Sequence, residues 1–286
     1  MITQLEVFTP RVTVPPLPIV DGSPANDPIQ IRNIDGLGPV TAQINTEQYG
    51  SLDGEFYTGG FTGKRNIVLT LGFNPDWSTQ TIESLRQIVY AYFMPKTQVK
   101  LRFTSTHMAQ VDTDGYVESC EPNIFSKDPE MQVSIICPNP AFYGSSVTVI
   151  PGETLALPDG LPTEIDYLGT LPTGFVLSVT PTDDAPSMAS GEVRIVNDDG
   201  IGTPDIFIVT GVKVDGTKYF QASSEQGNKY VRQIDTPSGV ETSILGQQAP
   251  GSIWMMLNNG VNLFRVMSDL PGQAWTMQYY AKYGGI

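Results

Sequence analysis

The chain has 286 residues, of which 40% are hydrophobic, and a formal net charge of -14 at pH 7. Single cores usually stop growing near roughly 250 to 300 residues, so this length favours two domains over one. The apolar content is high enough to exclude large-scale disorder. Because 30 Asp and Glu oppose 16 Lys and Arg, the composition also argues against specific nucleic-acid binding.

Targeting signals and disulfides are not expected. Residues 1–10 lack a basic stretch and an apolar run suited to a signal peptide, and no later stretch is long and apolar enough for a membrane span. We therefore expect the protein to fold in a cytoplasm. Cys120 and Cys137 are too few for a disulfide framework or a cysteine zinc site, so both are interpreted as reduced, packed thiols.

The first half of the chain has the pattern of a β protein. Glycine and proline, 28 and 23 in all, separate short segments rich in Val, Ile, Thr, Phe and Tyr. The run 15–28, rich in Pro and Asp, is interpreted as a loop or extended arm. Strands are expected at residues 5–14, 29–33, 41–46, 64–73, 99–104, 109–111, 116–120 and 131–137.

One helix is predicted over residues 78–93. Asp76 or Ser78 can cap its first amides, and Pro95 cannot continue its hydrogen-bond ladder. Apolar residues recur at helical spacing and form one stripe. They are Ile82, Leu85, Ile88 or Val89, and Tyr92.

A hairpin turn is predicted at Asp112-Thr113-Asp114-Gly115. An Asp-Gly pair is a strong hairpin signal, because glycine accepts the positive φ that a tight turn requires. The turn should therefore separate the strands at 109–111 and 116–120.

The second half of the chain predicts a β-sandwich. No helical stripe follows residue 147, and turn signals recur at the spacing that sandwiches show. We expect two domains, 1–146 and 147–286. Strands of the second are expected at residues 148–150, 163–167, 175–180, 191–197, 205–209, 218–220, 230–234, 252–257, 262–266 and 275–283.

The sequence offers little to support catalysis. His107 is the only histidine, which excludes a multi-histidine metal site, and there is neither a G-x-S-x-G elbow nor a phosphate-binding glycine loop. The run 197–200, Asn-Asp-Asp-Gly, with Asp205 nearby, superficially resembles a calcium loop, but it is interpreted as a hairpin turn. No catalytic, cofactor-binding or metal-binding residue is predicted, and we expect no enzyme activity and no cofactor.

Four aromatic residues leave an alternative open. Aromatic side chains at alternate positions of a strand usually fill a sandwich core, but they could also stack on a sugar ring. The four are Trp254, Trp275, Tyr279 and Tyr280.

Several stretches stand out when they are taken in order along the chain. They are 31–40 (IRNIDGLGPV), 53–57 (DGEFY), 64–69 (KRNIVL), 92–95 (YFMP), 115–118 (GYVE), 121–127 (EPNIFSK), 135–140 (IICPNP), 260–264 (GVNLF) and 279–286 (YYAKYGGI). Most of them lie within residues 1–145, and the last two belong to the chain's ending. In their order and spacing, these stretches resemble the distal tail protein family of bacteriophages.

The resemblance implies a mainly β, structural protein of the virion. It implies an N-terminal β-sandwich or split-barrel ring domain with one helix, followed by a galectin-like C-terminal β-sandwich. The expected assembly is a homo-hexamer at the distal end of the tail, made in the host cytoplasm. It would contact the tail tube protein, the baseplate hub or tail-associated protein, and other tail-tip proteins.

Two further expectations concern surfaces. Proline lowers the entropy that an extended segment loses on ordering, so the proline-rich run is a candidate inter-subunit arm, with an ordinary surface loop as the alternative. The residues concerned are Pro15, Pro16, Pro18, Pro24 and Pro28. The alternative function is a receptor- or carbohydrate-binding tail module in the C-terminal sandwich, with a host surface glycan as its ligand.

Overall fold

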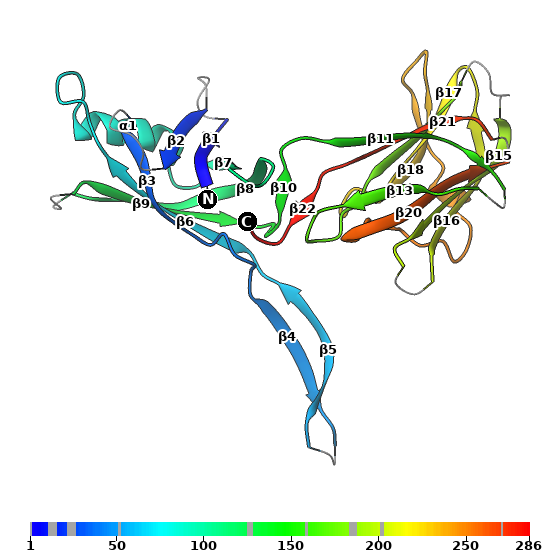
Figure 1. The fold of residues 1–286 in the computed structure, drawn as a ribbon, viewed down its shortest axis with the longest axis horizontal. Helices are drawn as coiled ribbons and strands as arrows, with labels where there is room; N and C mark the ends of the chain where they lie inside the picture. Colours follow the sequence, from blue (N-terminus) through cyan, green and yellow to red (C-terminus); the bar gives the residue numbers. More distant parts are fainter. Residues whose placement is uncertain are drawn as a thin grey trace. The chain divides into compact units, whose positions relative to one another are not determined.

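The computed structural model describes residues 2–10, 16–21, 27–50, 53–124, 128–157, 160–182, 188–200, 203–269 and 271–286. Over these residues the fold is mainly β, which confirms the predicted class. The helices are α1 (Ile82–Tyr92) and a short 3-10 turn, η1 (Leu245–Gln247) (Figure 1).

The chain divides into two compact units. Unit 1 comprises Met1–Ser145 and Tyr283–Ile286, and unit 2 comprises Ser146–Lys282. The expected division gave all of 147–286 to the second domain, whereas the last four residues pack with the first unit. The chain therefore passes between the units twice.

Unit 1 is built on a barrel. The strand order of its sheet is β22-β10-β8-β7-β1-β2-β3-β6-β9, and because β8 also pairs with β9, the strands from β8 round to β9 close on themselves. Closure leaves no free edge along this part of the sheet. The strands are β1 (Ile2–Phe8), β2 (Leu17–Asp21), β3 (Ile29–Asp35), β6 (Arg65–Phe73), β7 (Gln98–Ser105), β8 (Val111–Asn123), β9 (Glu130–Cys137), β10 (Phe142–Gly144) and β22 (Lys282–Tyr283).

Alternation in the strands fills the barrel, and α1 packs on its core. In β6 the predicted alternation holds, because Ile67, Leu69 and Leu71 are fully buried. Leu85 and Val89 of α1 join the same core. These residues belong to the apolar cluster that, among the described residues, forms the core of unit 1.

The helix begins later than predicted. Thr81, and not Asp76 or Ser78, is its N-cap: the Thr81 hydroxyl accepts a hydrogen bond from Ser84 N at 3.2 Å, and Ser84 Oγ accepts one from Thr81 N at 3.0 Å. Asp76 instead accepts a bond from Ser78 N within the preceding turn. This reciprocal capping box satisfies the backbone amides of Thr81 and Ser84 at the start of the helix.

The hairpin predicted at Asp112–Gly115 is wrong, because these residues lie inside β8. Asp112 is paired with Arg102 of β7, and the Arg102 guanidinium binds its carboxylate at 2.8 and 2.9 Å. Gly115 serves packing: a Cβ there would lie 2.6 Å from Ile135 Cγ2 and 2.9 Å from the Cys137 sulfur. An Asp-Gly pair therefore reflects here a close approach between strands and not a turn.

Part of the proline-rich run is a strand of the barrel wall. β2 pairs antiparallel with β1 and parallel with β3, and its Ile19 is fully buried. Pro18 lies in this strand opposite Glu6. The segment 17–21 is thus part of the fold of unit 1.

Unit 2 is a sandwich of two sheets. The first has the order β11-β21-β14-β17-β18-β19, and the second β12-β20-β15-β16, with β13 paired to β20. The core between them contains Phe220, Phe264 and Trp275. The strands are β11 (Thr148–Glu153), β12 (Leu155–Ala156), β13 (Thr163–Tyr167), β14 (Val176–Thr180), β15 (Met188–Asp198), β16 (Asp205–Val214), β17 (Lys218–Ser223), β18 (Tyr230–Asp235), β19 (Glu241–Ser243), β20 (Gly260–Ser268) and β21 (Ala274–Tyr279).

One predicted strand of unit 2 is absent from the described residues. The apolar run 252–257 makes one isolated β-bridge, between Leu257 and Thr173, and no regular strand. It is held to the sandwich by individual main-chain hydrogen bonds. Ile253 N donates to Ile206 O at 2.9 Å, and Leu257 and Thr173 exchange two main-chain bonds. Pro250 and Gly251 stand just before the run, where they disfavour a regular ladder.

Candidate assembly surface

A hairpin outside the barrel is the main candidate for contact with another molecule. Strands β4 (Ala42–Gln48) and β5 (Glu55–Thr62) pair with each other in a sheet of their own. Figure 1 shows this hairpin, in blue and cyan, extending away from the other strands of unit 1. Every residue of β4 is exposed, and so is every residue of β5 except Gly59.

Both faces of the hairpin carry apolar side chains. Ile44 lies opposite Gly60, and a Cβ on Gly60 would be 3.3 Å from Ile44 Cδ1 and 3.2 Å from the Tyr57 hydroxyl. Ile44 and Tyr57, 59% and 64% exposed, therefore share one face. Alternation places Phe61, 58% exposed, on the other face, with Phe56.

Polar groups collect toward the tip of the hairpin. The Thr46 hydroxyl donates to the Glu55 carboxylate, and Glu47 and Asp53 are also exposed. Near the tip, the rings of Tyr49 and Phe56 are 5.4 Å apart. The surface is therefore an apolar ribbon with an acidic end, chemistry that suits a protein partner that would bury the aromatic side chains.

A two-stranded ribbon of this kind gains little stability by itself. Isolated hairpins are marginal in water, and exposed edges with apolar side chains invite further pairing. The strand expected at residues 41–46 is confirmed as β4, whereas no strand was expected at the position of β5. Its signal was present as Phe56-Tyr57-Thr58 and Phe61, interrupted by Gly59 and Gly60.

Three of the five prolines of the predicted arm lie among the described residues. Pro15 and Pro24 lie outside the described residues, so for them the arm stays a prediction. Pro16 and Pro28 are partly buried; Pro28 O accepts a bond from Asn74 N at 2.9 Å, and Pro18 belongs to β2. The three described prolines thus lie in or beside the barrel wall.

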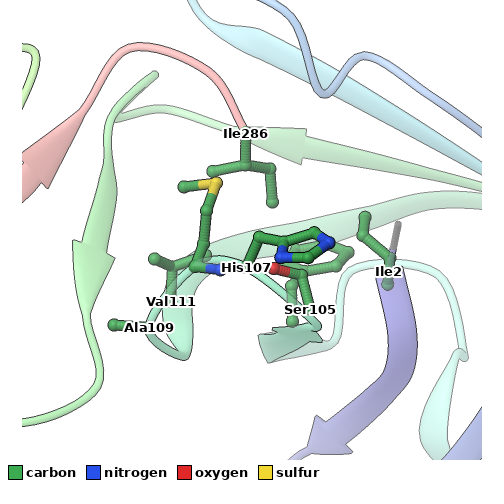
Figure 2. Close-up of a pocket in the computed structure, with 8 residues that line it drawn as sticks. Ile2, Ser105, His107, Ala109, Val111 and Ile286 are labelled. Atoms are coloured by element: carbon green, nitrogen blue, oxygen red, sulfur yellow. Dashed lines mark hydrogen bonds between the residues drawn. The ribbon is translucent and has the colours of Figure 1, made fainter.

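His107 lines a hollow in unit 1 with a volume of about 290 Å³. Figure 2 shows it among side chains that include Ile2, Val111 and Ile286. His107 itself is exposed and follows the end of β7. The side chains that line the hollow are mostly apolar, and they offer no obvious pair of reacting groups. The volume of the hollow is at the small end of the range for ligand pockets.

The two cysteines are free thiols in the structure. Cys137 is fully buried, and burial raises its pKa. Cys120 is half-buried beside the Met131 sulfur at 3.3 Å, and burial raises its pKa to about 11.

Cys120 is therefore expected to react slowly with iodoacetamide at pH 8. A pKa near 11 leaves about one thousandth of the thiol ionised, against roughly a quarter for an ordinary cysteine. Alkylation followed by mass spectrometry should show slow labelling of the native protein and fast labelling in guanidinium chloride. Native labelling at the rate of free cysteine would contradict the assignment.

The other sequence candidates are explained by local structure. The Asp198 carboxylate accepts a bond from Gly200 N at 3.0 Å, which fits the predicted turn. Among the described residues, no three His, Cys, Asp or Glu side chains are grouped as metal ligands would be. Trp275 and Tyr279 are buried in the core of unit 2, Trp254 packs on Phe207 at 4.8 Å, and Tyr280 is exposed.

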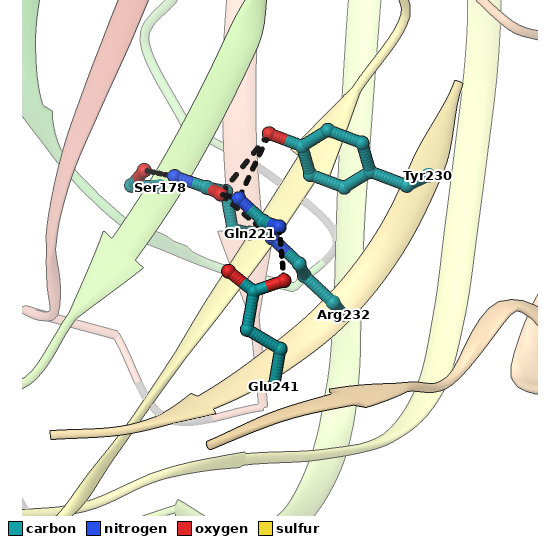
Figure 3. A network of polar contacts seen from close by, with 5 residues as sticks. All are labelled: Ser178, Gln221, Tyr230, Arg232 and Glu241. Carbon is teal, nitrogen blue, oxygen red and sulfur yellow. Dashed lines mark hydrogen bonds and ion pairs between the residues drawn. The ribbon is translucent and has the colours of Figure 1, made fainter. Parts of the chain in front are cut away.

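A row of polar side chains crosses one face of unit 2. Ser178 of β14, Gln221 of β17 and Arg232 of β18 lie opposite one another in register. Gln221 donates to Ser178 Oγ at 2.9 Å and accepts from Arg232 Nε at 2.9 Å, while Arg232 also binds Glu241 of β19 (Figure 3). The Arg232 guanidinium lies 4.2 Å from the centre of the Tyr230 ring.

Known proteins show where this architecture occurs. Residues 25–133 match the family model of the phage tail protein RIFT-related domain. This part of the chain is similar to a phage tail domain. The sequence matches none of the curated proteins with which it was compared. No described helix has the length and apolar character needed to cross a membrane.

A solved structure shares the fold of this chain over both units. The Dit protein of phage SPP1, described as a paradigm of the hub adsorption apparatus in phages that infect Gram-positive bacteria, is 14% identical with a TM-score of 0.62. The match covers 97% of this chain and 98% of that protein. The phage P2 baseplate in its activated conformation, with Ca or with Sr, contains chains that are 11% identical, with TM-scores of 0.49 and 0.48. The calcium form matches over all of both chains, and the strontium form over 99% of both.

The resemblance to the distal tail protein family is thereby confirmed. The tail domain covers most of the barrel, where the resembling stretches were found, and the fold of Dit extends over both units.

Proposed function

We propose that this chain is a structural subunit of a phage tail tip. Copies of it close into a hexameric ring that joins the tail tube to the baseplate hub and adsorption apparatus. The phage tail domain and the fold shared with SPP1 Dit support this role. The protein acts by assembly and not by catalysis. It is assembled in the host cytoplasm and resides at the distal end of the tail.

The hairpin β4–β5 is the observation that carries this proposal. Its binding partner is a second copy of the chain, because apolar side chains on both faces suit burial between two packed surfaces. When each copy gives its hairpin to one neighbour and receives one from the other, the contact is head-to-tail. Such contacts generate rings when the rotation closes.

The mass of the purified protein and its negative-stain images test the ring directly. The expected result is a hexamer in native mass spectrometry and six-fold annuli in the images. A compact monomer at every concentration would contradict the proposal.

We propose carbohydrate binding as a second function, carried by the polar row on unit 2. Arg, Glu and Gln side chains offer several hydrogen-bonding groups near each other, and Tyr230 adds an aromatic ring beside them. These four side chains lie on adjacent strands of one sheet. A host surface glycan is the proposed ligand.

A glycan array probed with the full chain tests this second function. Binding by the wild type, lost in Gln221→Ala and kept in Gln132→Ala, an exposed glutamine of β9 in unit 1, is the expected pattern. Binding that is absent, or indifferent to Gln221, would remove carbohydrate recognition from this face.

A further inference from the structure

Arg65 is a buried arginine held by main-chain carbonyl groups. It is the first residue of β6 and is 2% exposed. Its Nε donates to Pro140 O at 2.8 Å, Nη1 donates to Gly36 O at 2.5 Å and Gly38 O at 2.6 Å, and Nη2 donates to Gly284 O at 2.6 Å. The guanidinium carbon lies 4.3 Å from the centre of the Phe142 ring.

These carbonyl groups come from three separate segments of unit 1. Gly36 and Gly38 precede β4, Pro140 precedes β10, and Gly284 belongs to the segment in which the chain returns from unit 2. Arg65 itself follows β5 closely. The guanidinium thus lies where both strands of the hairpin leave the barrel.

Because Arg65 is buried, the stability of the fold depends on these hydrogen bonds. Removal from water lowers the pKa of Arg65, yet an arginine stays charged in a protein, so its donors require partners. A buried charge that loses its partners is strongly destabilising. The three segments are therefore held to Arg65, and through Arg65 to one another.

The return segment 283–286 also contacts the hairpin's root directly. Ile286 N donates to Leu37 O at 3.0 Å, and Tyr283 and Ile286 pack against the core of unit 1. Gly285 lies so close to Pro39 that a Cβ would be 2.9 Å from its nitrogen and its Cδ. Residues 37–39 therefore lie between the start of β6 and the return segment.

We propose that Arg65 and residues 283–286 form a clasp that fixes the direction of the β4–β5 hairpin. Arg65 is the positioning residue, and the hairpin side chains make the contact with the neighbouring copy. The clasp closes only when the chain that leaves unit 2 is docked on unit 1. This inference rests on the proposed ring, but the direction of the hairpin can be measured without a ring.

The strength of assembly depends on the fraction of copies whose hairpin points in the direction that binding requires. A hairpin that samples many directions presents its apolar faces correctly for only part of the time. If that part is about one tenth, the apparent affinity between copies falls about tenfold. Opening the clasp should therefore weaken the ring even though no residue of the contact surface has changed.

The test measures a distance between two spin labels in the full chain. One label is placed at Asp53 near the hairpin tip and the other at Gln132 on the barrel, both exposed, in a chain carrying Cys120→Ser. Labelled protein is diluted with unlabelled protein, so that only distances within one copy are observed. The variants are Arg65→Met, Arg65→Lys and Gly285→Ala, and the matched control is Arg32→Met, an exposed arginine of β3.

We expect one narrow distance in the wild type and in Arg32→Met, and a broad distribution in the three clasp variants. Ring formation by these variants should need about tenfold more protein. Should Arg65→Met fail to fold, Gly285→Ala, which leaves Arg65 intact, decides the matter. Narrow distributions in every folded variant would overturn the clasp. A broad distance distribution in a wild type that forms no rings would contradict both the ring and the fixed direction of the hairpin. A narrow distribution in a wild type that forms no rings, with broad distributions in the clasp variants, would contradict the ring alone.

Discussion

Replacing residues 42–62 by a short glycine-serine link is expected to leave a folded monomer that forms no rings. Ala42 and Thr62 face each other in register, so a short link can join the chain ends that remain. No core residue of unit 1 comes from this stretch, so the barrel should keep its thermal transition. Sedimentation velocity would measure the loss of assembly, and calorimetry the retained fold.

A finer variant separates the side chains from the backbone of the hairpin. Ile44→Ser, Tyr57→Ser and Phe61→Ser together keep β4 and β5 but remove their apolar anchors. An anchor at the centre of an interface contributes about 2 kcal/mol or more, so the loss of all three would weaken association by about ten-thousandfold or more. Rings of unchanged stability in this variant would show that the hairpin is not the contact.

The matched control uses apolar side chains that are equally exposed elsewhere. Leu161, Leu168 and Val240 of unit 2 are exposed and lie outside the hairpin. Their replacement by serine should leave assembly as it is. A similar loss of rings in this control would mean that general surface apolarity, and not the hairpin, drives association.

Deleting the proline-rich run would not test the candidate inter-subunit arm cleanly. Residues 17–21 form β2, whose Ile19 is buried in the barrel, so deleting residues 15–28 would open the wall between β1 and β3. Loss of rings would then follow from loss of the fold. Proline content indicated an extended conformation correctly, but it did not reveal that the segment was paired on both sides.

Alternation and helical spacing predicted those elements whose neighbours are regular. Strands such as β6 and β13, and the stripe of α1, follow from patterns in which one face is buried. Within the α1 stripe, the choice between Ile88 and Val89 is resolved by packing: Val89 is buried and Ile88 exposed. Periodicity alone left that choice open.

The errors arise where a contact distant in sequence decides the conformation. Gly115 is needed because Ile135 and Cys137 approach it, and this contact cannot be deduced from an Asp-Gly pair. The predictions for β5 and for the run 252–257 are wrong for a related reason. β5 pairs with β4 although glycines interrupt its apolar pattern, whereas the run 252–257 is apolar but forms no ladder. The clasp was equally hidden, because Arg65 and Gly284 are brought together only by the return of the chain from unit 2.

Trp275→Ala is expected to unfold unit 2 at a lower temperature while unit 1 keeps its own transition. Trp275 is 1% exposed, its ring lies 5.8 Å from Phe264, and its Nε1 donates to Glu153 O at 3.0 Å. Gly152 accommodates the ring, since a Cβ there would lie 2.3 Å from it. Truncating a buried tryptophan costs about 3–5 kcal/mol, a large part of the roughly 5–15 kcal/mol that stabilises a typical domain.

The same measurement tests whether the two units are independent domains, as we propose. Each unit has a hydrophobic core of its own, so differential scanning calorimetry should show two transitions, of which Trp275→Ala lowers one. Trp77→Ala is the matched control, because Trp77 of unit 1 is 73% exposed and its loss should change stability by no more than about 0.5 kcal/mol. A single transition that moves as a whole in Trp275→Ala would mean that the two covalent crossings couple the units into one cooperative structure. In that case the return segment, which joins unit 2 to the root of the hairpin, is the part of the chain in which to look for the coupling.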